Sequence, residues 1–423
     1  MADDDLVLFS NVGLSDVDTS GQTSTVCEPS VANNGDQILA TGNWYASRSL
    51  DRGATWAHIS PRSFFPATDG GFCCDQTVIY EHSRDITIWL LQYLEDSGTN
   101  SLRVAVKRGP TLGNNAWHWY DFKPDQVNAA WTGEWFDYNH AALSHNFLYI
   151  GTNAFQSGGS GGFTRSVVMR LPLDELARAQ GFTFNYFDTS QNGSLRCTQG
   201  AERTMYFASH NNLAQIRLWE WPEDTTTLSV YDIDVTQYEA GDYESSPAGQ
   251  GWLSRTDPRI TGGWVGKGRI GFMWTANADA THDAPYIRVV RIDETTKNLA
   301  DEPDIRNNRF AFAYPDVSPN DRGEIGVSML VGGGPFNLTH AVGMRDDADT
   351  RWRLAGTAFG TDLPSGGTSG DYTTVRRHSP NGLTWMAAGY SLQGGPGRSD
   401  VETRIVHFGR RGYQPAASRW FGV

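Results

Sequence analysis

The chain has 423 residues and a formal net charge of −14. This acidity argues against a nucleic-acid groove or an anionic membrane surface as the partner, because both recruit clustered Lys and Arg. No run of about 18 apolar residues occurs, so no transmembrane helix is predicted. The 46 Gly, 15 Trp and 16 Tyr residues, with short hydrophobic runs between turn-forming clusters, favour one all-β domain over residues 1–423.

The chain begins with the acidic segment MADDD, which is followed by the strand-like segment LVLFSNV. An acidic start lacks the positive charge that opens a signal peptide. We therefore predict no signal peptide here, and a secreted form of the protein would have lost its leader. Residues 5–12 are predicted to form a strand.

A four-residue pattern recurs along the chain: a polar or aromatic residue, any residue, a polar residue, and an apolar residue that opens a strand. The copies are EPSV from Glu28, DQTV from Asp75, YNHA from Tyr138, a degenerate TQGA from Thr198, DPRI from Asp257, YPDV from Tyr314 and YTTV from Tyr372. Successive copies begin 47 to 63 residues apart, which fits four strands and their loops. Seven copies predict an all-β, seven-bladed β-propeller with four-stranded antiparallel blades. The strand at residues 5–12 would close the last blade and remove its free edge; a two-domain β-sandwich is the main alternative.

Between the first two copies lies SLDRGATW, residues 49–56, which matches the pattern S-x-D-x-G-x-T-W. Ser49, Asp51 and Thr55 can bond the backbone of a turn, Gly53 can adopt a positive φ, and Trp56 can pack the turn onto a sheet. These roles are structural rather than chemical. Further along, LPLDELARAQG, residues 171–181, is the one convincing helix.

The repeat also predicts a site. Strand residues alternate between faces, so the first and third positions of the pattern should face the channel while the apolar fourth position packs between blades. The predicted ring consists of Glu28, Ser30, Asp75, Thr77, Tyr138, His140, Asp257, Arg259, Tyr314, Asp316, Tyr372 and Thr373 or Thr374. Such a cluster of polar groups in a concavity is typical of a ligand site; a water-filled polar channel is the alternative.

Two further features of the ring leave alternatives open. Arg259 could bind a substrate carboxylate or pair internally with Asp257 or Asp316. No cofactor is indicated with certainty, although the acidic residues could hold a structural calcium ion without a regular ligand loop.

The four cysteines cluster at the repeat. Cys27, Cys74 and Cys197 each directly precede a copy, and Cys73 precedes Cys74. With Cys27 and Cys74 on neighbouring blades, a disulfide from Cys27 to Cys73 or Cys74 would fit an oxidising compartment. Four reduced, buried thiols are the other expectation.

Through SLDRGATW, and more loosely through FDYNHAALSHNFLYIGTNAF and GDYTTV, the chain resembles the sialidase-like Asp-box β-propeller superfamily. The resemblance implies the propeller fold and a carbohydrate ligand or substrate. Sialidases have six blades, an Arg-Ile-Pro segment and three Arg that bind a carboxylate. This chain has only Arg48 before the Asp-box and one channel Arg, so sialidase activity is not expected. Seven-bladed propellers similar in outline include polysaccharide lyases and sugar-binding lectins.

Fold does not determine function, so three classes of function stay open. The leading expectation is a secreted or periplasmic protein that cleaves an acidic poly- or oligosaccharide. The alternatives are a non-catalytic lectin or adhesion module, and a scaffold or an enzyme of unrelated chemistry.

Two cleavage chemistries fit the ring. A lyase would use Arg259 to neutralise a uronate carboxylate, and His140, Tyr138 or Tyr314 to remove the C5 proton. A hydrolase would use two carboxylates about 5 Å apart for retention, or about 6.5–9.5 Å apart for inversion. The candidates for those carboxylates are Glu28, Asp75, Asp257 and Asp316. Tyr372 and Asp316 are the expected substrate-binding residues.

Overall fold

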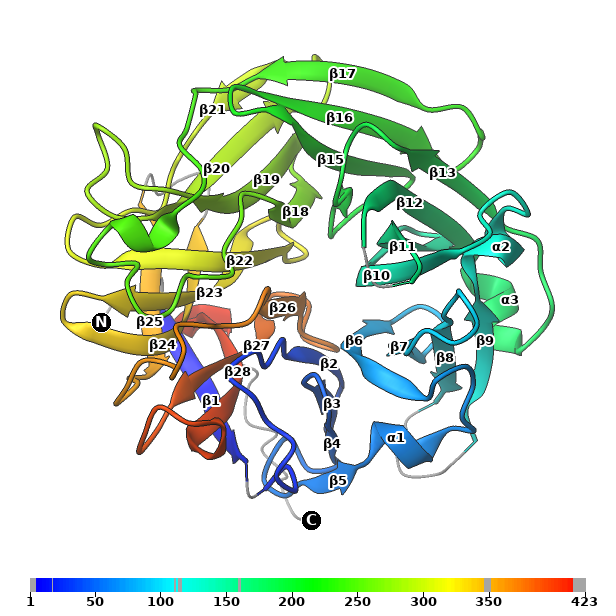
Figure 1. Ribbon diagram of the computed structural model, residues 1–423, viewed down its shortest axis with the longest axis horizontal. Helices are drawn as coiled ribbons and strands as arrows, with labels where there is room; N and C mark the ends of the chain where they lie inside the picture. The colour runs from blue at the N-terminus through cyan, green and yellow to red at the C-terminus, as the bar shows by residue number, and fades with distance from the viewer. Residues whose placement is uncertain are drawn as a thin grey trace, which may run out of the picture.

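Seven four-stranded antiparallel sheets surround a central channel in the computed structural model, which describes residues 5–16, 18–109, 112, 116–158, 161–345 and 351–413. The sheets are arranged around the channel like the blades of a propeller (Figure 1). The predicted seven-bladed β-propeller is therefore confirmed, and the β-sandwich alternative is wrong. Residues 1–4 of the acidic start lie outside the described residues.

Each blade runs outward from an inner strand next to the channel. The inner strands are β2 (Ser30–Asn34), β6 (Phe72–Glu81), β10 (Glu134–Leu143), β14 (Arg196–Cys197), β18 (Ile260–Gly266), β22 (Ala311–Pro319) and β26 (Thr374–Arg377). The second strands are β3 (Gln37–Thr41), β7 (Ile86–Tyr93), β11 (Phe147–Gln156), β15 (Thr204–Asn212), β19 (Arg269–Ala276), β23 (Ile325–Gly333) and β27 (Trp385–Leu392).

The outer half of each blade is a further pair of strands. The third strands are β4 (Ala46–Ser49), β8 (Leu102–Arg108), β12 (Phe163–Pro172), β16 (Gln215–Pro222), β20 (Tyr286–Asp293), β24 (Phe336–Arg345) and β28 (Val401–Arg410). The outermost strands are β5 (Ala57–Ile59), β9 (His118–Phe122), β13 (Asn185–Thr189), β17 (Ser229–Asp234), β21 (Leu299–Asp301), β25 (Arg353–Ala358) and β1 (Leu6–Ser15).

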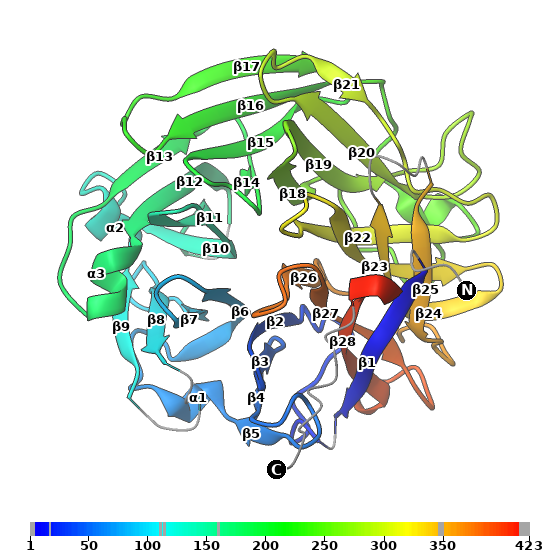
Figure 2. The ribbon, with the colours of Figure 1, turned by 180° about the vertical axis from the view of Figure 1, so that it is seen from behind.

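The N-terminal strand closes the ring. β1 pairs antiparallel with β28, from Leu6 opposite Arg410 to Ser15 opposite Glu402, and is the outermost strand of the last blade. Figure 2 shows β1 beside β28 on the side where the chain begins. The closing strand predicted from LVLFSNV is thus confirmed, and the backbone groups at the outer edge of β28 are paired.

Packing between blades holds the inner strands in place. Trp385 of β27 is fully buried and lies over Gly326 of β23 in the neighbouring blade, where an added Cβ would come within 2.5 Å of the indole. The Trp385 indole N–H donates to the Ser318 carbonyl of β22 at 2.8 Å. A close approach of this kind requires a residue without a side chain. Such contacts fix each blade against the next and so fix the groups that line the channel.

The Asp-box forms the turn between β4 and β5, at the outer edge of the first blade. The Gly53 N–H donates to Ser49 Oγ at 2.7 Å, and the Thr55 N–H donates to Asp51 Oδ1 at 2.8 Å. Gly53 has a φ of 88°, as the turn requires. The polar side chains of the Asp-box thus form hydrogen bonds within the turn itself.

Helices are few and short. The predicted helix forms as α3 (Leu173–Arg178), and α1 (Pro61–Phe64) and α2 (Pro124–Val127) are single turns that the sequence did not reveal. Three 3₁₀ turns are η1 (Tyr243–Ser245), η2 (Arg398–Asp400) and η3 (Arg411–Tyr413). None of the described helices has the length and apolar character needed to cross a membrane.

Candidate functional site

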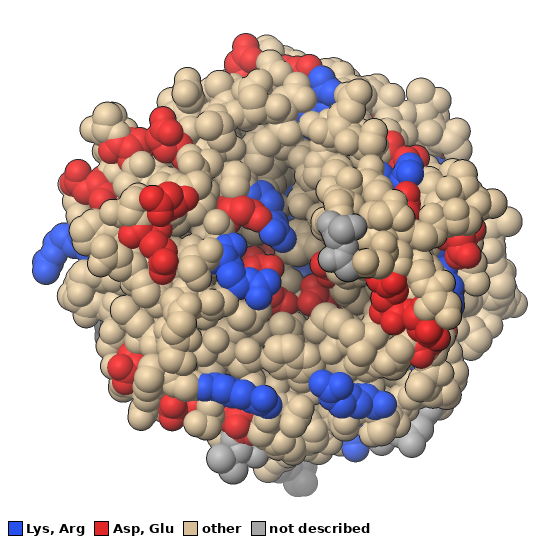
Figure 3. All heavy atoms as spheres, in the orientation of Figure 1, with Lys and Arg blue, Asp and Glu red and all other residues tan. Residues whose placement is uncertain are grey.

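The inner strands all begin at the same end of the channel, which we call the entry mouth. Seen from this end, the surface is hollowed at its centre, and basic and acidic side chains border the hollow (Figure 3). The first residues of six repeat copies lie here. Glu28, Asp257 and Tyr372 lie two or three residues before the inner strands β2, β18 and β26, whereas Asp75, Tyr138 and Tyr314 lie within inner strands.

Backbone conformation turns three of these residues out of the regular strand. Glu28, Tyr138 and Tyr314 have φ values of 49°, 59° and 55°. A left-handed conformation costs about 1–2 kcal/mol for a residue with a Cβ, so the surrounding structure must hold it. At Tyr138 and Tyr314 the pairing with the second strand also shifts register. The same bulge thus recurs in different blades and redirects side chains at the mouth.

The second blade carries a larger bulge. Phe72 pairs with Tyr93, but the next pair on β6 is Gln76 with Leu91, so residues 73–75 stand out of the ladder. Within this bulge Cys73 is disulfide-bonded to the adjacent Cys74. Asp75 follows directly, so the disulfide constrains the segment that carries this carboxyl group.

The predicted disulfide from Cys27 to Cys73 or Cys74 is wrong. Cys27 is a buried free thiol whose Sγ lies 3.4 Å from Thr403 Oγ1, and burial raises its pKa to about 12. Cys27 points into the packing between the first and last blades, whereas the β6 bulge carries Cys73 and Cys74 away from the ladder. Cys197 is also a buried free thiol, so the expectation of four reduced cysteines is likewise wrong.

Glu28 and Asp75 form a coupled carboxyl pair at the mouth. Burial, followed by the charges of Asp75 and Asp371, raises the pKa of Glu28 well above its usual range. Burial and the charges of Asp137 and Asp371 raise the pKa of Asp75 to about 7, although a hydrogen bond with Glu28 acts in the opposite direction. The pair therefore holds a proton at a pH where isolated carboxyl groups have lost theirs.

Asp137 and Asp371 belong to this cluster although the sequence analysis did not select them. Each directly precedes a repeat tyrosine, in the dipeptides Asp137-Tyr138 and Asp371-Tyr372. The Asp371 N–H lies 3.4 Å from Glu28 Oε1, and Gln92 donates to Asp137 Oδ1 at 2.9 Å. The shared Asp-Tyr dipeptide was the signal in the sequence that could have identified both residues.

Arg259 is engaged by protein carboxylates. Its Nε donates to Asp257 Oδ2 at 2.7 Å, and its Nη1 lies 3.9 Å from Asp371 Oδ2. Its guanidinium carbon lies 4.4 Å from the centre of the Tyr138 ring. Of the two roles considered for Arg259, this geometry favours the internal ion pair, with Asp257 and not with Asp316.

The tyrosines at the mouth differ in what their hydroxyl groups contact. The Tyr138 and Tyr372 rings lie 6.2 Å apart, and neither buried hydroxyl has a hydrogen-bond partner among the described residues. Burial raises the pKa of Tyr138 to about 12, so this phenol stays protonated near neutral pH. The Tyr314 hydroxyl instead accepts a hydrogen bond from Thr256 at 2.7 Å. Tyr138 and Tyr372 are therefore the two phenols at the mouth whose buried hydroxyl groups lack a partner among the described residues.

The third positions of the repeat hold neighbouring inner strands together. The Val78 N–H donates to Ser30 Oγ at 3.0 Å, Thr77 Oγ1 donates to the Asn139 carbonyl at 3.2 Å, and Thr374 Oγ1 donates to the Pro29 carbonyl at 2.9 Å. Thr373 Oγ1 donates in the same way to the Tyr314 carbonyl at 3.1 Å. These hydroxyls serve the contact between blades rather than a ligand.

His140 and Asp316 also lie between inner strands, away from the carboxyl cluster. His140 Nε2 accepts the Cys197 N–H at 3.1 Å, and Asp316 accepts hydrogen bonds from Arg196 and Arg376. Burial and the two arginine charges hold the pKa of His140 well below its usual range. The predicted ring is thus divided between the mouth and the wall deeper in the channel.

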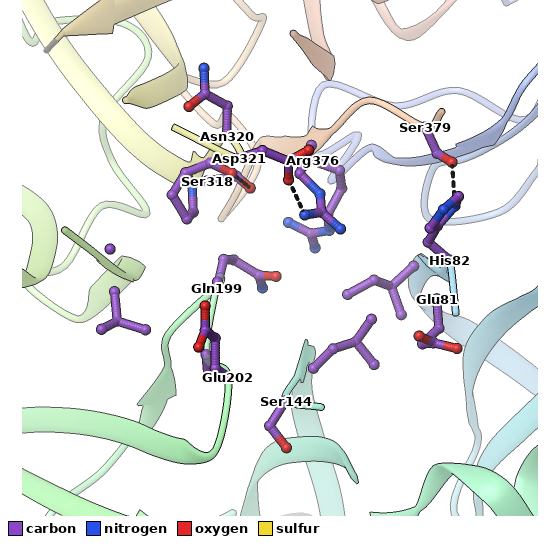
Figure 4. Close-up of a pocket in the computed structure, with 18 of the residues that line it drawn as sticks. Glu81, His82, Ser144, Gln199, Glu202, Ser318, Asn320, Asp321, Arg376 and Ser379 are labelled. Carbon is purple, nitrogen blue, oxygen red and sulfur yellow. Dashed lines mark hydrogen bonds and ion pairs between the residues drawn. The ribbon is translucent and has the colours of Figure 1, made fainter. Parts of the chain in front are cut away.

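A separate cavity of about 720 Å³ lies at the opposite end of the channel, which we call the exit cavity. Its wall includes Glu81, Ser144, Gln199, Asp321 and Arg376 (Figure 4). None of the nine residues predicted as catalytic or substrate-binding lines it.

Among the described residues, no group of three or more His, Cys, Asp or Glu side chains is arranged to hold a metal ion. This part of the chain therefore offers no set of ligands for the structural calcium ion that the sequence left open.

No protein-family model and no curated protein matches this chain. Among solved structures, it is similar to an α-L-arabinanase from Penicillium chrysogenum, determined with arabinobiose, with 10% identity and a TM-score of 0.44 over 94% of this chain and 98% of that chain. A protein of unknown function from Dyadobacter fermentans has 10% identity and a TM-score of 0.44, over 95% and 98% of the two chains. A sialidase from Streptococcus pneumoniae has 11% identity and a TM-score of 0.41, over 73% and 66%. Similarity at this level says nothing about the chemistry of the site.

Proposed function

We propose that this protein hydrolyses glycosidic bonds at the entry mouth, with the carboxyl group of Asp75 as the proton donor. The observation that carries the proposal is the Glu28–Asp75 pair, in which the pKa of Asp75 is raised to about 7. A general acid is most effective when its pKa lies near the working pH. A carboxyl group that keeps its proton beside other carboxylates supplies the acid and base that glycoside hydrolysis needs.

Asp137 is our choice for the second carboxylate, because its negative charge is the largest charge effect on the pKa of Asp75. Asp75 would donate its proton to the glycosidic oxygen as the bond to the leaving sugar breaks. A water molecule would add to the anomeric carbon and pass its proton to Asp137. The products are two saccharides with one new reducing end.

The charge of the mouth favours a neutral glycan over the acidic one expected from the sequence. The carboxyl groups gathered there outnumber the arginines; they are Glu28, Asp75, Asp137, Asp257 and Asp371, against Arg255 and Arg259. Because Arg259 is already paired with Asp257, little positive charge is left for a uronate.

An aromatic strip beside the mouth supports a sugar substrate. Trp135 precedes Asp137 by two residues on β10, so the two side chains leave the strand on the same side. The Trp135 ring lies 5.5 Å from Phe155, which lies 6.1 Å from the exposed Phe163. Aromatic faces of this kind bind the apolar faces of sugar rings.

The lyase chemistry gains less support. His140 already uses its Nε2 lone pair to accept the Cys197 N–H, which leaves the ring without a free basic nitrogen. A lectin would use the same aromatic strip without the carboxyl pair, so it is the second candidate function. Cleavage of a glycan would distinguish the hydrolase from the lectin.

The test is a panel of neutral and acidic polysaccharides incubated with purified protein, in which new reducing ends and the ultraviolet absorbance of an unsaturated uronate are both recorded. We expect reducing ends from a neutral glycan without absorbance. Asp75→Asn should lower the rate about 100-fold or more, whereas Asp51→Asn at the Asp-box should retain it. Absorbance would select the lyase, binding without cleavage would select the lectin, and a fully active Asp75→Asn variant would refute the assignment of the acid.

A further inference from the structure

Two buried arginines share one carboxylate in the wall of the channel. Arg196 Nη2 of β14 lies 2.6 Å from Asp316 Oδ1, and Arg376 Nη1 of β26 lies 2.9 Å from Asp316 Oδ2. The Val375 N–H also donates to Asp316 Oδ2, at 2.9 Å. Asp316 thus accepts three hydrogen bonds, and its one negative charge neutralises only one of the two guanidinium charges.

The unbalanced charge is buried. Arg196, Arg376 and Asp316 are 6%, 7% and 1% exposed. The charges that act on Arg376 are those of Asp316, which favours its protonated form, and of Arg196, which opposes it. Burial and Arg196 together lower the pKa of Arg376, as expected where positive charge lacks a counter-ion. A buried net charge is strongly unfavourable unless something neutralises it.

Two buried N–H groups at the same place have no acceptor among the described residues. Arg376 Nε is one of them, and His140 Nδ1 is the other. Because His140 Nε2 accepts the Cys197 N–H, the ring proton of a neutral His140 is on Nδ1, which is then a donor. Cys197 directly follows Arg196 in β14, so this hydrogen bond places His140 beside the Arg196 end of the group.

Of the two arginines that share Asp316, Arg376 lines the exit cavity. Arg376 lines this cavity together with Gln199, and both side chains extend towards its interior (Figure 4). The neighbouring Arg377 also lines the cavity, but it is half-exposed and paired with Asp321. The group of Arg196, Asp316 and Arg376 thus carries one excess positive charge, whereas Arg377 is balanced by Asp321.

We propose that Arg376, supported by Arg196 and His140, binds a small monovalent anion, a halide or a simple carboxylate, where its side chain lines the exit cavity. One negative charge matches the single excess positive charge. An anion accepts hydrogen bonds and donates none, as the two N–H groups require. The site is independent of the hydrolase proposed for the entry mouth.

The experiment measures the unfolding midpoint at constant ionic strength while sodium gluconate is replaced by sodium bromide, and in a second arm by sodium formate. Ligand that binds only the folded state raises the midpoint with the logarithm of its concentration. We expect this rise for the wild-type protein in at least one arm. Arg376→Gln should abolish it, and the matched control Arg377→Gln should retain it.

A second measurement keeps the proposal testable if Arg376→Gln fails to fold. Crystals of the wild-type protein soaked in bromide should give an anomalous peak beside Arg376 Nε, and crystals soaked in formate should show a carboxylate there. If the unfolding midpoint rises with bromide alone or with formate alone, the result identifies which anion binds and supports the site. Midpoints independent of both anions, with water beside Arg376 Nε after both soaks, would overturn it.

Discussion

Glu28 and Asp75 come from neighbouring blades and hold their carboxyl groups in hydrogen-bond contact at the entry mouth of the channel. Each is brought there by an irregular backbone: a left-handed φ at Glu28 and the β6 bulge before Asp75. Because the charge of Asp75 raises the pKa of Glu28 and the interaction with Glu28 in turn affects the pKa of Asp75, the two carboxyl groups titrate as a pair.

The first prediction concerns stability against pH. The pKa of Asp75 is raised to about 7 in the folded protein, above the ordinary value of about 4 in the unfolded chain. The folded state therefore binds the additional proton, and stability should fall as the pH rises from about 4 to about 7. Asp75→Asn should be more stable than the wild type at pH 8 and flatten this slope, as measured by chemical denaturation from pH 4 to 8. An Asp75→Asn variant that is less stable than the wild type at pH 8, with an unchanged dependence of stability on pH, would show that the pKa of Asp75 is not raised in the folded protein.

A second prediction concerns Arg259. Arg259→Gln leaves Asp257 without its cation, while Asp371 keeps Arg255. The change should destabilise the fold by about 1–2 kcal/mol, less than the roughly 3–5 kcal/mol of a fully buried pair because this one is partly exposed. Adding Asp257→Asn should recover part of the loss, since it removes one uncompensated carboxylate. Denaturant titration of the two single variants and the double variant measures the coupling. Strict additivity would mean that Arg259 is free for a ligand.

The Asp-box provides a third prediction. Asp51 accepts hydrogen bonds from the Thr55 N–H and hydroxyl, and these bonds lower its pKa below the ordinary value. Asp51→Ala should lower the unfolding midpoint by roughly 1–3 °C. Its effect should begin to shrink below about pH 4, where the unfolded chain takes up the proton, and should be lost as the pH falls through the lower pKa of the folded protein. Catalytic rates should stay at the wild-type level, and a loss of activity in a folded Asp51→Ala protein would contradict the structural role.

The cysteines give a fourth prediction. Alkylation in denaturant without a reductant should modify only Cys27 and Cys197, because Cys73 and Cys74 are bonded to each other. Alkylation after reduction should modify two further residues, Cys73 and Cys74. Peptide mass mapping reads the result, and modification of all four residues before reduction would contradict the observed pairing.

The sequence predicted the propeller because its evidence is repetitive. Six copies place an apolar residue at the fourth position, and alternation along a strand makes that position pack between blades. Local backbone irregularity is not visible in such a pattern. The bulge at Tyr138 admits Asp137 to the mouth, and the bulge after Phe72 joins Cys73 to Cys74 instead of to Cys27.

The degenerate fourth copy explains the other omission. The pattern placed its start at Thr198, whereas the inner strand is β14 at Arg196–Cys197. Arg196 was therefore missed, and Asp316 was assigned to the mouth although its partners are Arg196 and Arg376. Charge pairing across blades depends on which residues meet in the closed ring, and one strand pattern does not contain that information.

The most direct test of the account is an infrared titration of protonated carboxyl groups, comparing the wild type with Asp75→Asn between pH 5 and pH 9. The account predicts a carboxylic-acid C=O band in the wild-type protein near neutral pH that titrates with a midpoint of about 7 and is absent from Asp75→Asn. If the two proteins give the same carboxyl signal throughout this range, Asp75 holds no proton near neutral pH and the proposed acid is wrong.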